Sequence, residues 1–142
     1  MNIEGIINVT GKPGLHKIIS QGKNTVIVES LTDKKRIPVY SHNQANSLEE
    51  IGIYTYEDTI PLADIFTRIA KKENCKQCIS HKKGKEELHL YFRDILPEYD
   101  EDRVYISDIK KVFQWYNALE DAGLVKITEE EKVKKNTKTQ EK

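Results

Sequence analysis

The chain has 142 residues, with 23 Lys and Arg against 23 Asp and Glu, and 37% of its residues are hydrophobic. Its length suits one domain or two small ones, and its hydrophobic fraction is too high for a wholly disordered chain. A formal net charge of zero removes the strongest sequence argument for nucleic-acid binding. No apolar run reaches the roughly 18 residues that a membrane helix needs, so we expect no membrane segment. Residues 1–10 lack the basic start and apolar stretch of a signal peptide, so we expect a cytoplasmic protein with reduced thiols.

Residues 1–58 are predicted to be rich in β-strands. Ile3, Ile6 and Ile7 share one helical face, which predicts a short leading helix over residues 2–8. Strands, separated by turns and a polar loop, are then expected at residues 15–19, 25–31, 36–40 and 51–56. Pro38 removes one backbone donor, so its strand should lie at a sheet edge or carry a bulge. Short strands and tight turns predict a small, strongly bent β-barrel of the SH3 or Sm type.

The chain changes to helical periodicity at residue 59. Thr59 is expected to cap a first helix that runs to about Glu73. A polar and irregular loop is expected over residues 74–84. A second helical stripe follows and stops before Pro97, because the residue preceding a proline disfavours helical backbone.

A third helix is expected near the end of the periodic region. Ser107 is the predicted cap, and Phe113 lies at the middle of the apolar face. Gly123 stands where a left-handed residue would end this helix, and Leu124 would then contact Leu119 in a Schellman ending. Beyond residue 127 no periodicity survives, and we predict a solvated, disordered tail.

These elements predict an α+β chain in three parts. An Sm-like barrel with its leading helix covers residues 1–58, a domain of about three helices covers residues 59–127, and the tail covers residues 128–142. A folded unit of about 60 residues buries little of its surface, so the helices should pack on the barrel or the barrel should self-associate. Because small barrels with exposed edge strands often pair edge to edge, we expect a homo-oligomer.

Four segments of the chain resemble a family of uncharacterised bacterial proteins made of two domains of unknown function. They follow one another in the family's order, at Gly11–Lys17, Val26–Leu31, Arg36–Val39 and Val104–Phe113. The resemblance spans roughly residues 2–125 and implies an Sm-like N-terminal domain, with no established activity. In the family pattern Tyr stands at the position of His16, and no cysteine pair lies in the loop at residues 74–84. The resemblance therefore assigns no functional residue.

Three residues of that loop have the spacing of metal ligands, namely Cys75, Cys78 and His81. Two thiolates separated by two residues can reach one zinc ion, and the histidine would be a third ligand. A structural zinc site normally uses two such pairs, and the second pair is absent. The alternative interpretation is a loop with two ordinary thiols, and we predict no cofactor.

A second candidate site lies on the hairpin before the strand at residues 36–40. In Sm-like barrels this hairpin and a later loop help to hold an RNA base, which would involve Lys34, Lys35, Arg36, His42, Asn43 and Asn46. The alternative is a solvated turn, because charged residues at a hairpin tip keep it hydrated. A phosphate-binding surface should be visibly basic, whereas residues 1–60 carry no basic excess.

Aromatic residues provide a third candidate. Trp115 flanks the apolar face of the third helix, so it either packs inside the protein or contributes to a partner-binding surface. Tyr54 carries the same two interpretations. No Ser-His-Asp arrangement, phosphate loop or dinucleotide fingerprint is present, so we expect no enzymatic activity. The leading hypothesis is a non-enzymatic protein-interaction module, and the alternative is an RNA-binding or RNA-linked regulatory protein acting through the barrel.

Overall fold

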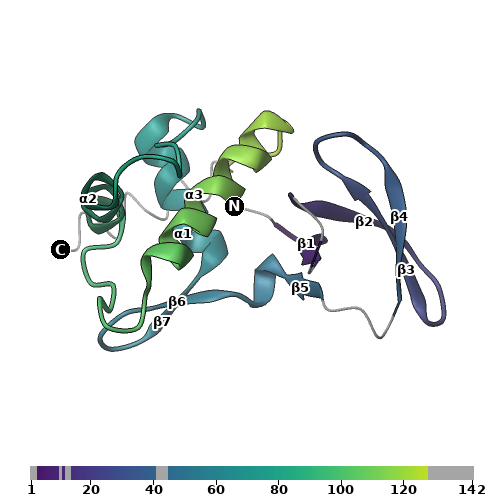
Figure 1. Ribbon diagram of the computed structural model, residues 1–142, viewed down its shortest axis with the longest axis horizontal. Helices are drawn as coiled ribbons and strands as arrows, with labels where there is room; N and C mark the ends of the chain where they lie inside the picture. The colour runs from purple at the N-terminus through teal and green to yellow at the C-terminus, as the bar shows by residue number, and fades with distance from the viewer. Residues whose placement is uncertain (1–2, 10, 12–13, 41–44, 128–142) are drawn as a thin grey trace.

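A computed structural model describes residues 3–9, 11, 14–40 and 45–127. The structure has a five-stranded sheet and three α-helices. Figure 1 shows this sheet towards one end of the molecule and the helices towards the other, with the last helix in front. A small two-stranded sheet lies beside the helices (Figure 1). This combination of antiparallel sheets and helices confirms the predicted α+β class. No helix in the described part of the chain is both long and apolar enough to span a membrane.

The five-stranded sheet is antiparallel and open. Its strands are β1 (Ile6–Val9), β2 (His16–Gln21), β3 (Thr25–Ser30), β4 (Arg36–Tyr40) and β5 (Ala45–Ser47). Their order is β4-β3-β2-β1-β5, so β4 and β5 are edges and the predicted closed barrel is wrong. The barrel does not close because β5 has three residues and pairs only with β1 within the described sheet. The edge position predicted for the strand containing Pro38 is confirmed.

The first element differs from the predicted helix over residues 2–8. Ile6 and Ile7 lie in β1, which pairs with β2 on one side and β5 on the other. Gly5 precedes the strand with a φ of +79°, a left-handed conformation that ends any helical path from Ile3. β-branched residues favour strands, and pairing with distant segments overrides the helical spacing of the isoleucines. Asn2 lies outside the described residues.

The segment expected to complete the barrel forms a separate hairpin. After a 3₁₀ turn, η1 (Leu48–Glu50), strand β6 (Gly52–Tyr54) pairs with β7 (Thr59–Pro61). A side chain at Gly52 would place its Cβ 2.4 Å from the Thr59 side chain, so the two strands need glycine there. Thr59 is therefore a strand residue, and its predicted capping role is wrong.

Three helices follow, α1 (Leu62–Glu73), α2 (Lys85–Ile95) and α3 (Ile106–Asp121). The predicted end of the first helix at Glu73 is confirmed. Helix α3 begins one residue before the predicted cap Ser107, and Asp108 accepts a 3.0 Å hydrogen bond from the Tyr105 backbone. The Asp108 carboxylate therefore satisfies a backbone donor at the start of this helix.

The ending of α3 has the predicted Schellman geometry. Gly123 has a φ of +73° and donates a backbone hydrogen bond to Glu120 at 2.9 Å. Leu124 donates to the Leu119 carbonyl, also at 2.9 Å. These two bonds satisfy carbonyls that have no partner inside the helix.

One hydrophobic core joins the sheet to the helices. From the β half it takes Ile6 and Leu48, and from the helices it takes buried residues such as Phe66 and Phe113. A smaller cluster lies apart from it and includes Ile7 and three valines, Val9, Val28 and Val39. Since neighbouring residues of a strand point to opposite faces, β1 contributes to both clusters. The helices therefore pack against the β half.

Candidate functional site

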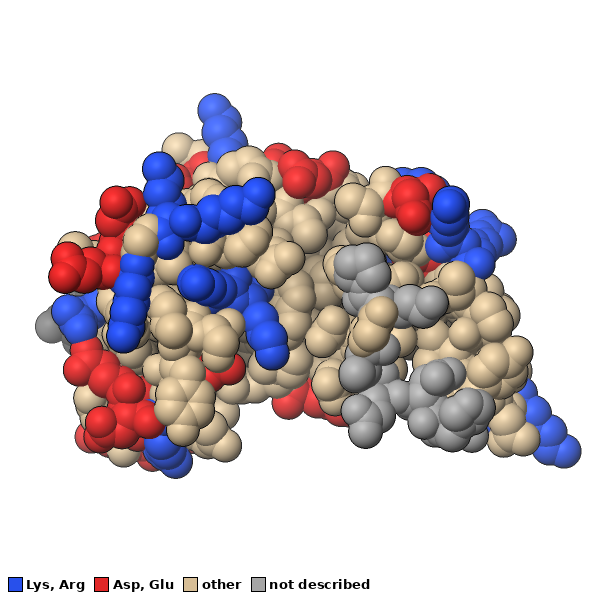
Figure 2. All heavy atoms as spheres, in the orientation of Figure 1, with Lys and Arg blue, Asp and Glu red and all other residues tan. Residues whose placement is uncertain are grey.

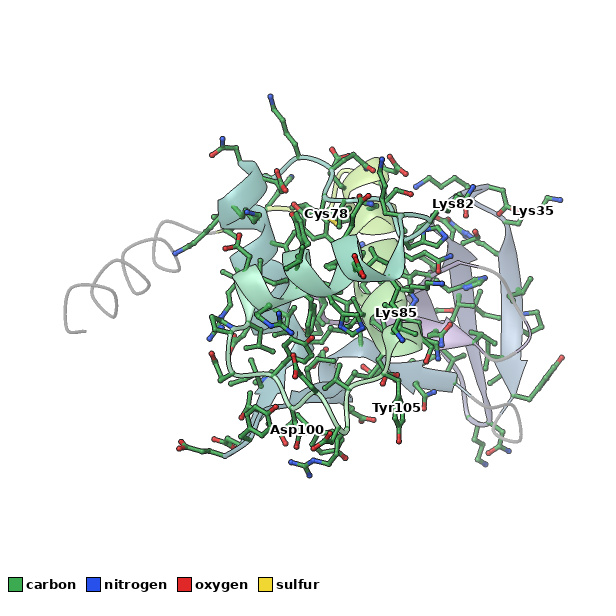
Figure 3. The ribbon with its side chains drawn as sticks, turned by 60° about the vertical axis from the view of Figure 1, so that its left-hand side comes forward. Lys35, Cys78, Lys82, Lys85, Asp100 and Tyr105 are labelled. Atoms are coloured by element: carbon green, nitrogen blue, oxygen red, sulfur yellow. The ribbon has the colours of Figure 1, made fainter. Side chains whose placement is uncertain are left out.

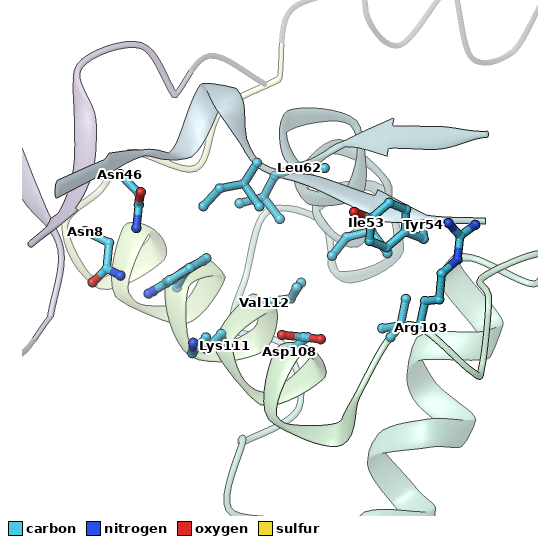
Figure 4. A pocket seen from close by; sticks show the side chains of 13 residues that line it. Asn8, Asn46, Ile53, Tyr54, Leu62, Arg103, Asp108, Lys111 and Val112 are labelled. Carbon is cyan, nitrogen blue, oxygen red and sulfur yellow. The ribbon is translucent and has the colours of Figure 1, made fainter. Parts of the chain in front are cut away.

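A pocket of about 270 Å³ lies between the end of the sheet and helix α3 (Figure 4). Its lining comes from β1, β5, the segment through β6, the start of α1, and α3 with the residues just before it. These segments are far apart in the sequence. The pocket therefore exists only because the two halves pack together.

Some of the lining residues are apolar or aromatic. Ile51, Leu62 and Val112 line the pocket together with Tyr54 and Trp115. Trp115 is partly buried and packs against the main core, so it both supports the fold and faces the pocket. Tyr54 is 46% exposed. The structure thus brings together the two aromatic residues that the sequence offered as a partner surface.

Other lining residues are polar. Asn8 and Asn46 are opposite each other in the pairing of β1 with β5, and both side chains line the pocket (Figure 4). Lys111 reaches it from α3. None of these three side chains forms a hydrogen bond or an ion pair with another described residue. Two carboxamides and an ammonium group are therefore available to a ligand.

Two further charged residues of the pocket have structural partners. The Arg103 guanidinium donates to Asp100 Oδ2 at 2.8 Å and lies over the Tyr54 ring, 4.3 Å from its centre. This ion pair lowers the pKa of the Asp100 carboxyl. Asp108 accepts the hydrogen bond that starts α3. Lys111 is thus the lining cation that lacks a carboxylate partner in the described structure.

The cysteine loop between α1 and α2 is held against α3. Asn117 Oδ1 accepts a 2.8 Å hydrogen bond from the Cys78 backbone, and Tyr116 donates its hydroxyl to the Lys76 carbonyl at 2.8 Å. Burial raises the pKa of the Cys78 thiol to about 12. Figure 3 shows Cys78 beside the helices. The loop therefore has a structural explanation that involves no ligand.

The predicted metal ligands receive no support from this geometry. Within the described ranges, no group of three or more His, Cys, Asp or Glu side chains is placed to hold a metal ion. Burial raises the pKa of the Cys78 thiol and so disfavours the thiolate while no metal is bound. The set of Cys75, Cys78 and His81 stays a prediction.

The predicted RNA-binding hairpin carries a mixed charge. Arg36 forms a 3.2 Å ion pair with Glu29, and the Lys35 backbone donates to the Asp33 carboxylate at 3.0 Å. Lys34 is exposed and adopts a left-handed φ of 64°. Figure 2 shows acidic and basic side chains side by side at this end of the molecule. His42 and Asn43 lie outside the described residues, so this site stays a prediction.

Basic side chains gather instead over the helical half, on the face turned to the viewer in Figure 2. Seven exposed lysines of the helical half have no ion pair in the described structure, and five of them lie at residues 82–85 and 110–111. These five are Lys82, Lys83, Lys85, Lys110 and Lys111. Figure 3 places Lys82 and Lys85 along this half.

Sequence reasoning missed Asn8 and Lys111, two of the three polar side chains of the pocket that are available to a ligand. Asn8 interrupts the side of β1 on which Ile6 joins the main core, and a strand interpretation of residues 6–9 would have shown this. Lys111 carries no such signal, because an exposed lysine on a helix is ordinary. Its unpaired position in a pocket depends on packing between the two halves.

Comparison with known proteins gives the family of this chain. Residues 3–48 match a family model described as Domain of unknown function (DUF5606), and residues 51–119 match Domain of unknown function (DUF6852). The pocket takes Asn8 and Asn46 from the first match and Trp115 from the second. It therefore lies between the two domains that the models define.

A solved structure is similar over most of the chain. It is the solution NMR structure of a protein from Bacteroides vulgatus, determined by a structural genomics consortium, with 44% sequence identity and a TM-score of 0.72. The similarity covers 88% of this chain and 90% of that one. A search among curated proteins finds no match. The chain thus belongs to a two-domain family of unknown function, as its sequence motifs indicated.

Proposed function

We propose that this protein is a non-enzymatic interaction module that binds an extended peptide segment of a partner in the pocket between its two domains. The observation that carries this proposal is the presence of both Tyr54 and Trp115 in the lining of one pocket, to which both domains contribute. Junctions between domains are frequent ligand sites, and tyrosine and tryptophan are enriched among residues that dominate binding energy.

The sheet edge beside the pocket suits an extended peptide. β5 is the last strand of the sheet, and its residue Asn46 lines the pocket. A peptide that adds to such an edge makes backbone hydrogen bonds, and alternate side chains then point to the same side. An edge strand next to an aromatic pocket therefore offers backbone hydrogen bonds to the peptide and a binding site for one of its side chains.

The pocket also supports binding rather than catalysis. Asp108 and Arg103 are already engaged in contacts that hold the chain, which leaves carboxamides and one ammonium group as the available polar groups. Carboxamides do not exchange protons at neutral pH and so cannot act as general acids or bases. This composition favours recognition of a ligand.

RNA binding has weaker support at the hairpin that the sequence favoured. Arg36 is paired with Glu29, and a phosphate-binding surface relies on cations that are free to release counterions. RNA binding is therefore one of the outcomes that the experiment distinguishes. A fluorescently labelled single-stranded RNA of mixed sequence is titrated against the full chain at low and high salt.

The test of the proposal uses the single tryptophan of the chain as its reporter. Peptides are selected from a displayed random library on the immobilised full chain, synthesised and titrated while Trp115 emission is recorded. We expect a saturable change in emission, and we expect Tyr54→Ala to weaken binding by about 2 kcal/mol or more. Failure of every selected peptide to bind, or tight RNA binding that leaves peptides unbound, would contradict the proposal.

A further inference from the structure

We infer that the peptide presents an acidic side chain to Lys111, while Asn8 and Asn46 hold its backbone. This inference rests on the proposed function and adds the chemical class of the ligand. It follows from three features of the described residues: the unpaired carboxamides, the unpaired ammonium group and the position of the aromatic residues.

The two carboxamides form a matched pair. Asn8 and Asn46 are direct cross-strand neighbours, and such neighbours have side chains on the same face of a sheet. Each carboxamide has two N–H donors and one carbonyl acceptor, and neither group has a protein partner among the described residues. A peptide unit has one donor and one acceptor, so this pair complements the backbone of an extended chain.

The ammonium group of Lys111 gives the pocket a site for a carboxylate. The charged lining residues of the pocket are Arg103, Lys111 and Asp108, and Asp100 outside the lining neutralises Arg103. Asp108 is only three positions from Lys111, but no ion pair joins them, and its carboxylate accepts from the Tyr105 backbone instead. An incoming carboxylate would therefore find an ammonium group with no competing partner in the protein, and hydrogen bonds between charged groups are among the strongest.

The aromatic lining of the pocket adds a second position to the expected motif. Trp115 and Tyr54 suit an apolar or aromatic side chain, and the apolar residues Ile51 and Val112 also line the pocket. In an extended chain, residues two positions apart point to the same side and are about 7 Å apart. We therefore expect an acidic residue two positions from an apolar one.

The experiment compares two charge reversals on the full chain. Displayed random peptides are selected on the wild type, on Lys111→Glu and on Lys110→Glu, with circular dichroism confirming that each variant is folded. Lys110 is an exposed neighbour on α3 that does not line the pocket, so its reversal changes the net charge equally. We expect acidic peptides from the wild type and Lys110→Glu, and Lys or Arg at the same peptide position from Lys111→Glu.

A second measurement isolates the contact. Replacing the acidic peptide residue by its amide should weaken binding to the wild type at least tenfold and leave binding to Lys111→Gln nearly unchanged, the pattern of a coupled pair. Peptides that shift Trp115 emission without an acidic preference would overturn this inference and leave the proposed function standing. Equal loss of acidic peptides in both reversals would also overturn it, because attraction would then be diffuse. Absence of any peptide binding would instead overturn the proposed function.

Discussion

The Cys78 thiol shows how position controls the chemistry of one residue. Burial raises its pKa to about 12 from a usual value of 9.0, because the thiolate is poorly solvated there. At pH 8 a group with that pKa is ionised in only about one molecule in ten thousand. We expect Cys75→Ser, which retains Cys78, to react with iodoacetamide far more slowly when folded than when unfolded, as mass spectrometry would show.

The same shift has a consequence for stability. A folded-state pKa above the unfolded one favours the neutral thiol in the folded protein. The contribution of the neutral Cys78 thiol to the free energy of unfolding is complete below about pH 9 and is lost as the pH rises towards 12. Rapid labelling of folded Cys75→Ser at pH 8 would contradict this description of the loop.

Phe113 and Trp115 are two positions apart on α3 and test the division between core and pocket. Phe113 is fully buried and meets Tyr91 edge-to-face at 5.2 Å. Phe113→Ala should therefore lower the free energy of unfolding by about 3–5 kcal/mol. Trp115 is only partly buried, so Trp115→Ala should cost clearly less stability and mainly reduce binding. Urea denaturation followed by circular dichroism measures both, and equal losses would show that Trp115 is a core residue.

The Schellman ending of α3 gives a prediction for one element. Gly123 has a φ of +73°, where a side chain is strained, although no heavy atom lies within 4 Å of a Cβ placed there. Gly123→Ala should lower the free energy of unfolding by about 1 kcal/mol through the backbone alone. Gly84 is a matched control, since a Cβ there also meets nothing and its φ is −63°. Gly84→Ala should change stability by only a few tenths of a kcal/mol, and similar losses at both glycines would refute the backbone explanation.

The shared core gives a prediction for the whole molecule. Ile6 and Leu48 from the first domain pack in one cluster with Leu62 and Phe66 from the second. Domains that share a core lose stability together, so unfolding should occur in one transition. Trp115 emission, which reports on the second domain, and far-ultraviolet circular dichroism should give the same urea midpoint. Leu48→Ala should lower both midpoints equally, and two separated transitions would show that the domains unfold independently.

The open sheet bears on self-association. β4 is an edge strand, and Tyr40 at its end is 47% exposed. Exposed edges pair readily with other strands, so we predict a homo-oligomer formed through β4. Light scattering should give a mass above 16.5 kDa, and Tyr40→Lys should shift it towards that value by placing charge at the edge. A mass of 16.5 kDa at every concentration would contradict the prediction.

Features of the fold that depend on neighbouring residues could be predicted from the sequence. The end of α1 at Glu73, the left-handed Gly123 and the edge position of Pro38 are all predicted correctly. Each depends on a few neighbouring residues, through periodicity, a turn conformation or a missing donor. The family could also be predicted from the sequence, because its motifs are contiguous segments.

Tertiary structure decided the rest. Ile3, Ile6 and Ile7 fit a helical spacing, but two distant strands provide backbone partners for β1, and this pairing outweighs the local pattern. The candidate pocket joins Asn8 and Asn46 to Lys111, residues that no sequence spacing connects. The sequence by itself determined the helices, their endings and the family, since those signals are local. Only tertiary structure decided the open sheet and the pocket, because both depend on packing between distant segments.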